Sequence, residues 1–131
     1  MNNLTEVKFI SDRKGRGLFA KKDIEKGKTV DIAHLVLISN KEWRLIKDTI
    51  LSRYTFEWDD PKCKGKYESA ISLSVNQFIN HSYTPNVEYS YNYKNKSIKY
   101  TAIRKISKGE EITVNYNGYP CDNSPVGFRV E

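Results

Sequence analysis

Residues 80–86 read NHSYTPN, and residues 109–116 read GEEITVNY. In the first stretch an Asn-His pair leads into a Pro-Asn dipeptide, which is typical of a sharp turn. In the second stretch a glycine turn is followed by Ile112 and Val114 in alternation with polar residues, the pattern of a short half-buried strand. A third stretch, residues 14–20, reads KGRGLFA and places two glycines directly before an apolar run. The three stretches frame a chain that is otherwise rich in short strand patterns.

Taken in this order and spacing, the three stretches resemble the signature of the SET domain, the protein-lysine methyltransferase fold, in its minimal viral or bacterial type. The resemblance implies a mostly β, β-clip-like fold of several small sheets, with a knot-like threading that brings residues 80–86 beside residues 109–116. It also implies one SET domain over residues 1–131, whose C-terminal tail (about residues 120–131) closes the site. The cofactor implied is S-adenosylmethionine, and the substrate is a lysine of a protein.

The remaining chain fits a β-rich fold with one substantial helix. Ser39 and Glu42 form a plausible capping box, and apolar residues recur behind it at helical spacing, which predicts a helix over residues 40–53. Residues 59–67 hold proline, glycine and several charges and are interpreted as a loop. Further short strands are predicted at residues 7–10, 29–38 and 70–73. A hairpin is predicted at residues 87–93 with 98–102, and a single helical turn at residues 75–79.

Methyl transfer to lysine is an in-line displacement in which a neutral amine attacks the methyl carbon of a sulfonium. At pH 7 a lysine with a pKa of ~10.4 is almost wholly protonated, so exposing the neutral amine costs about 4.6 kcal/mol. The site must therefore desolvate the amine next to a cation and align it with the methyl group. Tyrosine hydroxyls and carbonyl oxygens suit this task, and a strong general base is not essential.

Two of the three stretches are assigned to cofactor binding by the resemblance. Gly15 and Gly17 carry no side chain and let the backbone approach the cofactor, with the backbone of Arg16 between them as the expected contact. Asn80 offers a side-chain carbonyl to the cofactor's ammonium group. His81 braces this segment with its backbone facing the adenine, so its side chain is expected to be structural and not a proton shuttle. A simple tight turn would also explain the glycines, but the Leu-Phe-Ala that follows them favours the family's loop.

The catalytic tyrosine is placed by the resemblance at Tyr116, whose hydroxyl would contact the sulfonium methyl and the incoming amine. Tyr54 and Tyr89 are assigned to the reaction as walls of the lysine channel, together with Tyr119 and, from the tail, Phe128. If Tyr89 narrows this channel, the products are biased toward lower methylation states. Core packing stays open as the alternative for Tyr54, Tyr89 and Tyr119.

Departures from the family pattern also carry information. The family usually has an aspartate before its catalytic tyrosine, whereas this chain has Asn115, so no negative charge is expected there. Many members carry a zinc-binding cysteine cluster after the final motif. Here that region holds only Cys121, while zinc generally needs four ligands, so we expect no metal. Glu110 and Glu111 are interpreted as structural residues that pair with or cap nearby chain.

Composition excludes several classes of protein. Hydrophobic residues make up 38% and charged residues 29% of the 131 residues, which is typical of a globular domain and not of a disordered chain. No apolar run approaches the ~20 residues that cross a bilayer, so no membrane partner is expected. No signal peptide is recognised either. Cys63 and Cys121 suit a reducing compartment, with one bridge between them left open. We expect a cytoplasmic bacterial protein, or one in the host nucleus if the source is a virus or an intracellular pathogen.

Charge and residue choice bear on the partner. The net charge of +6 attracts polyanions weakly. Lysines greatly outnumber arginines, and arginine reads phosphates and base edges better, so nucleic acid is not expected as the primary ligand. The favoured function is an S-adenosylmethionine-dependent protein-lysine N-methyltransferase that acts on a histone or another basic protein. The alternative is a SET-like binding module that has lost catalysis and recruits a protein or nucleic-acid partner. The oligomeric state stays open, a homodimer included.

Overall fold

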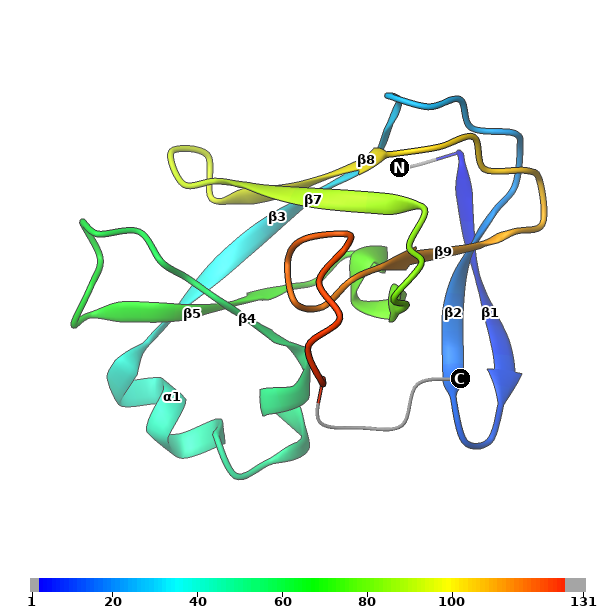
Figure 1. The fold of residues 1–131 in the computed structure, drawn as a ribbon. Helices are drawn as coiled ribbons and strands as arrows, with labels where there is room; N and C mark the ends of the chain where they lie inside the picture. The colour runs from blue at the N-terminus through cyan, green and yellow to red at the C-terminus, as the bar shows by residue number, and fades with distance from the viewer. Residues whose placement is uncertain (1–2, 127–131) are drawn as a thin grey trace. The chain divides into compact units, whose positions relative to one another are not determined.

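Short β-strands dominate the computed structural model, which describes residues 3–126 (Figure 1). The strands are β1 (Thr5–Ser11), β2 (Gly15–Ala20), β3 (Thr29–Ser39), β4 (Thr55–Glu57), β5 (Tyr67–Ser72), β6 (Asn80–His81), β7 (Val87–Asn92), β8 (Ser97–Ala102) and β9 (Glu111–Val114). The helical segments of the described chain are α1 (Asn40–Ile46) and two short 3-10 helices, η1 (Ile50–Tyr54) and η2 (Val75–Phe78). The predicted fold class, mostly β with several sheets, is confirmed.

The chain packs as two units that interleave along the sequence. The first unit takes the chain up to residue 32, residues 78–90 and residues 99 onward, and the second takes residues 33–77 and 91–98. Strands β3, β7 and β8 each begin in one unit and end in the other. The five-stranded sheet to which they belong has the order β4-β5-β3-β8-β7. All three of the sequence stretches that indicate a SET domain lie in the first unit.

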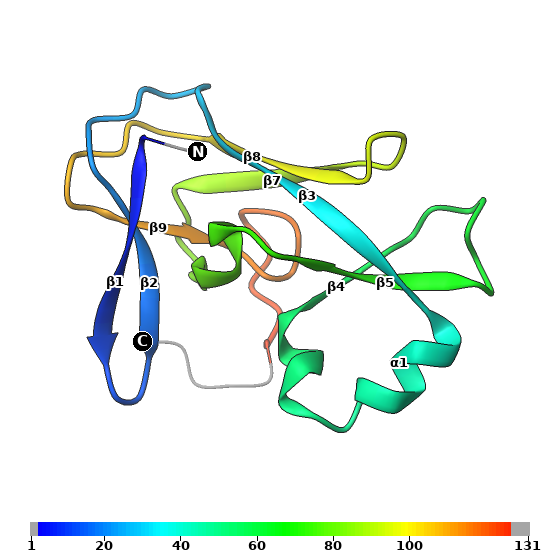
Figure 2. The same ribbon diagram turned by 180° about the vertical axis from the view of Figure 1, so that it is seen from behind.

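A four-stranded sheet in the order β1-β2-β9-β6 organises the first unit. Strands β1 and β2 form an antiparallel pair, seen from both sides in Figures 1 and 2, with a register shift between Phe9 and Ser11. Strand β9 pairs antiparallel with β2 and parallel with β6, where Asn80 lies opposite Thr113. The prediction that the Asn80 and Tyr116 segments lie side by side is therefore confirmed. Their knot-like threading stays a prediction.

Strand alternation sets the core of the first unit. In β9 the buried Ile112 and Val114 alternate with Glu111 and Thr113, which are only half-buried. A strand places successive side chains on opposite faces, so Glu111 and Thr113 share the other face of the sheet. The buried apolar residues of this unit are Leu18, Ala20, Ile24, Val30, Ile79, Val87, Tyr100, Ala102, Ile106, Ile112 and Val114. The core thus lies on the face of β9 away from the polar residues of the candidate site.

The second unit is built around strand β5, which pairs antiparallel with β3 on one side and with β4 on the other. Trp58, which is 1% exposed, provides the largest buried side chain, and the ring of Tyr93 meets its ring edge-on at a centroid distance of 4.8 Å. Helix α1 begins at the predicted capping box. The Ser39 side chain accepts from the backbone N–H of Glu42, and the Glu42 side chain accepts from the Ser39 backbone.

The helix predicted over residues 40–53 is shorter than expected. Helix α1 ends at Ile46, and the chain resumes as the 3-10 helix η1 only at Ile50. Thr49 causes the break, because its hydroxyl donates to the Ile46 carbonyl (2.7 Å) and accepts from the Leu51 amide (3.3 Å). A threonine that hydrogen-bonds neighbouring backbone in this way caps a helix instead of continuing it. The apolar spacing that predicted one helix instead spans two separate turns.

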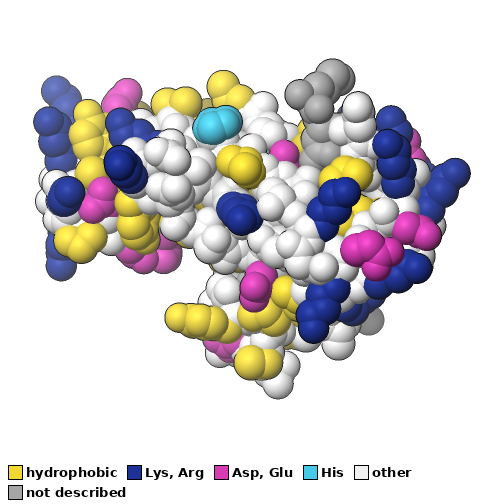
Figure 3. All heavy atoms as spheres, turned by 90° about the horizontal axis from the view of Figure 1, so that it is seen from above, with side chains coloured by type: hydrophobic (Ala, Val, Ile, Leu, Met, Phe, Trp, Pro, Cys, Tyr) yellow, Lys and Arg dark blue, Asp and Glu magenta, His cyan; other side chains and the backbone are white. Residues whose placement is uncertain are grey.

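The surface of the described residues carries side chains of both charges. On the face shown in Figure 3, Lys and Arg side chains stand in several separate groups, with Asp and Glu among them. Both Cys63 and Cys121 are free thiols. Within residues 3–126, no helix is long and apolar enough to span a bilayer.

Candidate active site

Gly15 and Gly17 each occupy a position that a side chain would disturb, for different reasons. Gly15 has φ +74°, the left-handed region that glycine adopts without strain, and there is open space beside it. At Gly17 an added Cβ would meet Ile10 Cδ1 at 2.7 Å, Glu111 Oε2 at 2.8 Å and Asn80 Nδ2 at 3.1 Å. The second glycine is therefore required by packing against polar side chains of the site, which the sequence did not reveal.

Asn80 is anchored through both hydrogens of its side-chain amide. Its Nδ2 donates to the Arg16 carbonyl oxygen at 3.1 Å and to Glu111 Oε2 at 2.8 Å. Both partners are acceptors only, so the amide nitrogen must face them. The Asn80 Oδ1 atom accepts no hydrogen bond from any residue that the structure describes. The oxygen is thus oriented by the chain and left available to a donor.

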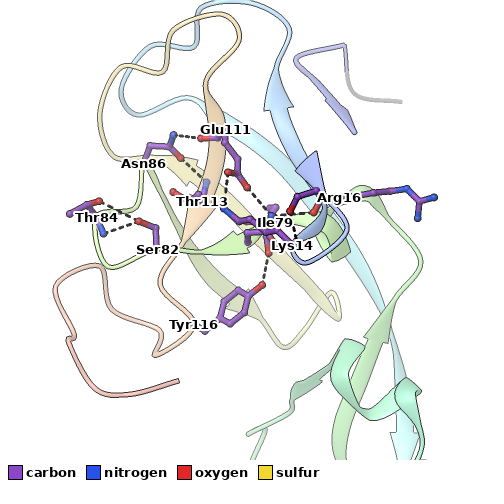
Figure 4. Close-up of polar contacts among 11 residues, drawn as sticks. Lys14, Arg16, Ile79, Ser82, Thr84, Asn86, Glu111, Thr113 and Tyr116 are labelled. Carbon is purple, nitrogen blue, oxygen red and sulfur yellow. Dashed lines mark hydrogen bonds and ion pairs between the residues drawn. The ribbon is translucent and has the colours of Figure 1, made fainter. Parts of the chain in front are cut away.

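Glu111 joins the amide of Asn80 to a cation, Lys14, which Figure 4 shows beside it. Its Oε1 atom lies 3.3 Å from Lys14 Nζ, and only 23% of the lysine side chain and 20% of the glutamate side chain are exposed. Lys14 comes from the turn before β2, Glu111 from the start of β9 and Asn80 from β6. Three separate segments of chain therefore meet in one hydrogen-bonded row.

Tyr116 follows β9 and is fixed at both its backbone and its hydroxyl. The hydroxyl donates to the Ile79 carbonyl oxygen at 2.7 Å, and the backbone N–H donates to His81 Nδ1 at 2.9 Å. Although 46% of the residue is exposed, burial around the hydroxyl, the Glu111 carboxylate and Tyr89 together raise the pKa of Tyr116 to about 12. The phenol is therefore neutral over the whole physiological range.

His81 has the structural role that the sequence predicted for its side chain. It is 5% exposed, and the ring of Tyr83 meets it edge-on at a centroid distance of 4.5 Å. Because Nδ1 accepts the hydrogen bond from the Tyr116 amide, that nitrogen must be unprotonated. Burial lowers the pKa of His81 below its ordinary value of 6.5, which favours the neutral form that this bond needs.

We expect the free energy of unfolding to fall as the pH drops from about 7 to about 5, because of His81. Between the lowered pKa of the folded chain and 6.5, the unfolded chain binds more protons than the folded one. Stability is therefore lost as the pH falls through this window. Thermal unfolding at several pH values measures the slope, and His81→Asn should remove most of it while keeping an acceptor near the Nδ1 position.

His34, the other histidine of the chain, supplies the matched control because its side chain is exposed. His34→Asn should retain the full pH slope. An unchanged slope in His81→Asn would show that another group causes the acid sensitivity.

The other predicted site residues are divided between the two units. Tyr89 belongs to the first unit. Its hydroxyl lies 3.8 Å from the position that a Cβ on Gly118 would take, and its ring centroid lies 5.9 Å from that of Tyr100. Tyr119 is in the same unit and is 74% exposed. Tyr54 belongs to the second unit, at the end of η1, and is 42% exposed. A shared channel of these tyrosines with Tyr116 stays a prediction. Phe128 lies outside the described residues.

Asn115, where the family usually has aspartate, uses a property that aspartate lacks. The residue is 3% exposed, and its Nδ2 donates to the carbonyl oxygens of Asp122 (2.6 Å) and Pro120 (3.4 Å). Asn117 repeats the pattern, with its Nδ2 donating to the Ser124 carbonyl at 2.7 Å. Two asparagine amides thus hold the described part of the tail. Among residues 3–126, no group of three His, Cys, Asp or Glu side chains could hold a metal ion.

Sequence reasoning missed the role of Glu111 and of the Ile79 carbonyl. Glu111 and Glu110 were interpreted as pairing or capping residues, and both do pair: Glu111 with Lys14, and Glu110 with Arg104 (2.9 Å) and the Ser107 amide (3.2 Å). The bond from the Asn80 amide to Glu111 was not predicted. Strand alternation within GEEITVNY does place Glu111 opposite the buried apolar face, and that was the available signal. A backbone carbonyl such as that of Ile79 leaves no trace in the side-chain pattern.

Comparison with known proteins identifies the class. The family model of the SET domain matches residues 15–117. The chain is 28% identical over 110 residues to the H3 lysine-37-specific histone-lysine N-methyltransferase of Schizosaccharomyces pombe, covering 83% of this chain and 71% of that protein. It is 31% identical over 126 residues to the histone-lysine N-methyltransferase trithorax of Drosophila virilis, covering 90% of this chain. It spans only 3% of the length of that second relative.

Solved structures agree with this class. A Plasmodium falciparum protein whose name assigns it to the histone methyltransferases aligns with a TM-score of 0.66 at 25% identity, covering 88% of this chain and 95% of the other. A humanized mutant of the Chaetomium thermophilum Polycomb Repressive Complex 2 aligns with a TM-score of 0.71 at 26% identity, covering 92% of this chain and 16% of the other. The chain belongs to the SET domain family, and with relatives of this kind it is a protein-lysine methyltransferase.

Proposed function

We propose that this chain transfers a methyl group from S-adenosylmethionine, in line, to the neutral amine of a protein lysine. The observation that carries the proposal is the mutual placement of Asn80 and Tyr116. The tyrosine donates hydrogen bonds to the residues on either side of the asparagine, Ile79 and His81. An acceptor for the cofactor's ammonium group and a hydroxyl for the reaction centre are therefore fixed to each other by the same few residues.

The donor and acceptor chemistry of the site fits the cofactor. Asn80 Oδ1 is held outward by the two bonds of its nitrogen, and a carbonyl oxygen is a suitable acceptor for an ammonium group. The Gly15–Gly17 segment, whose residue 16 carbonyl contacts the same amide, contributes backbone at the same place. When bound, S-adenosylmethionine supplies a methyl group on a positively charged sulfur.

Tyr116 presents a neutral oxygen to the reaction centre. Its proton is directed to the Ile79 carbonyl, so the hydroxyl presents its oxygen, and not its proton, to the reaction centre. Because the hydroxyl is fixed before the reaction, no reorganisation of this dipole is needed during transfer. The walls of the lysine channel belong to the same proposal, with Tyr89 and Tyr119 of the same unit as its side chains.

We expect the rate of methyl transfer to rise with pH from about 7 toward about 10, as the substrate amine loses its proton. Tyr116 should add no descending limb in this range, because its pKa of about 12 keeps the phenol neutral. Initial rates at saturating cofactor, measured across this range in buffers of equal ionic strength, give the profile. A decline centred well below pH 10 in a chain that is still folded would show that the tyrosine ionises earlier.

Relatives named as histone-lysine methyltransferases support a histone or another basic protein as the substrate. The test is transfer from labelled S-adenosylmethionine into core histones and into a bacterial lysate, with cofactor binding measured separately by calorimetry. We expect label on lysine, and mass spectrometry of the product then tests the bias toward lower methylation states that a narrowing Tyr89 implies.

The two measurements separate the enzyme from its rival. A chain that neither binds the cofactor nor labels any protein would fit the catalytically inactive binding module instead. Labelling that appears only in the lysate would support the methyltransferase activity and exclude core histones as the substrate.

A further inference from the structure

We infer that Glu111 is a positioning residue for the cofactor, because its carboxylate fixes the orientation of the Asn80 amide and so aims Asn80 Oδ1 at the cofactor's ammonium group. This inference rests on the proposed function. It gives a specific task to a residue whose sequence pattern indicated only pairing or capping.

Geometry around the amide supports the assignment. Asn80 Nδ2 lies 2.8 Å from Glu111 Oε2 and 3.1 Å from the Arg16 carbonyl oxygen, so each amide hydrogen has one acceptor. A hydrogen bond to a charged acceptor is about twice as strong as one between neutral groups, so the bond to the carboxylate is the dominant one. Lys14 holds the other carboxylate oxygen at 3.3 Å and keeps Glu111 in place.

Reversal of the amide shows why the carboxylate matters. Turning the Asn80 side chain by half a turn would place Oδ1 against the carboxylate and the Arg16 carbonyl, two groups that only accept hydrogen bonds. This repulsion leaves one orientation. A glutamine at position 111 carries both a donor and an acceptor, so it can satisfy either orientation of Asn80. Glu111→Gln should therefore weaken the preference, which the Arg16 carbonyl alone then supports, while keeping the size of the side chain.

Gly17 leaves the space that the contact between Glu111 and Asn80 needs. The same two atoms that bond to each other, Glu111 Oε2 and Asn80 Nδ2, lie 2.8 and 3.1 Å from the position of an added Cβ. A side chain at position 17 would therefore push against the carboxylate and the amide. The second glycine of the Gly15–Gly17 stretch serves this contact between side chains as well as the approach of the backbone to the cofactor.

The decisive experiment compares two ligands on the same variant. S-adenosylhomocysteine carries the ammonium group, whereas 5′-methylthioadenosine lacks the whole amino-acid portion. Measured by calorimetry, Glu111→Gln should weaken the binding of S-adenosylhomocysteine by about 10-fold or more, the scale of one hydrogen bond to a charged group. The affinity for methylthioadenosine should stay within about twofold of the wild-type value. Glu110→Gln is the matched control, since Glu110 does not contact Asn80, and it should leave both affinities within about twofold.

A double-mutant cycle separates positioning from direct contact. In an Asn80→Ala background, Glu111→Gln should have no further effect on S-adenosylhomocysteine, because no amide remains to be oriented. A full additional loss there would mean that the carboxylate acts on the ligand itself and would overturn the inference. Equal affinities of wild type and Glu111→Gln would overturn it as well. A wild-type chain that binds neither ligand would refute the proposed function first.

A measurement on the wild-type chain covers the case in which Glu111→Gln does not fold. Acidification followed by NMR should shift the side-chain amide resonances of Asn80, because one of its two acceptors is a carboxylate. The side-chain amide of Gln77, which donates to the backbone carbonyls of Tyr54 and Ser72, should stay constant over the same range. Asn80 resonances that do not move would show that the carboxylate does not control the amide.

Discussion

Tyr116→Phe is expected to reduce methyl transfer by on the order of 10²-fold or more, while cofactor affinity stays within a fewfold of wild type. The substitution removes only the hydroxyl, whose oxygen is fixed by its 2.7 Å bond to the Ile79 carbonyl. That carbonyl loses its donor, so we also expect a loss of about 1–3 kcal/mol in the free energy of unfolding. Single-turnover rates with labelled cofactor, together with calorimetric affinity, measure the two effects separately.

Tyr67→Phe is the matched control for this substitution, because Tyr67 lies in β5 of the second unit, whereas Asn80 and Tyr116 belong to the first. It should retain the wild-type rate. If Tyr116→Phe kept more than about a third of that rate, the hydroxyl would not be part of the reaction centre, and the tyrosine would serve only to hold residues 79–81.

Asn115→Asp, which installs the residue usual in the family, is expected to destabilise this chain by about 3 kcal/mol at pH 7. Asn115 is 3% exposed, and its amide nitrogen lies 2.6 Å from the Asp122 carbonyl oxygen. A carboxylate cannot donate to that oxygen, and its charge would be buried beside it. Urea unfolding of the two chains at equal ionic strength measures the difference.

The sign of the pH dependence provides a second check on Asn115→Asp. Burial beside a carbonyl raises the pKa of the new carboxyl above its unfolded value of ~3.9. The folded variant then binds more protons than its unfolded form, so its deficit grows as the pH rises through this range. Asn117→Asp, at a half-buried position with the same kind of partners, should cost less. A deficit that is independent of pH would mean that shape, and not charge, causes the loss.

Local chemistry explains which parts of the fold could be predicted. The strand pattern after Gly109 and the turn at Pro85 follow from alternation and turn residues, and both appear in the structure as β9 and the chain after β6. The capping box at Ser39 was equally local and is confirmed. The length of the helix was not, because a side-chain bond from Thr49 back to Ile46 competes with an apolar spacing that favours continuation.

The candidate site was likewise predictable only in part. Asn80, His81 and Tyr116 were predicted because the resemblance to the family fixes their positions, and the structure brings all three together. Their mutual support was not predictable, since it depends on which segments pair across the sheet. The bond from Tyr116 to the Ile79 carbonyl and the contact of Glu111 with Asn80 join residues 37 and 31 positions apart. No pattern within either segment encodes such a distance.

The parallel pairing of β6 with β9 has a consequence for when, during folding, the enzyme becomes able to bind its cofactor and react. Strand β6 comprises only Asn80 and His81, and its partner lies more than thirty residues along the chain. Loop-closure entropy opposes so distant a pairing, so it is expected to form late in folding and to be among the first to open locally. Opening would separate Asn80 from Glu111 and Tyr116 from Ile79 in one event. The chain then loses and regains cofactor binding and the geometry for methyl transfer together. A bound ligand favours the closed state, in which both are present.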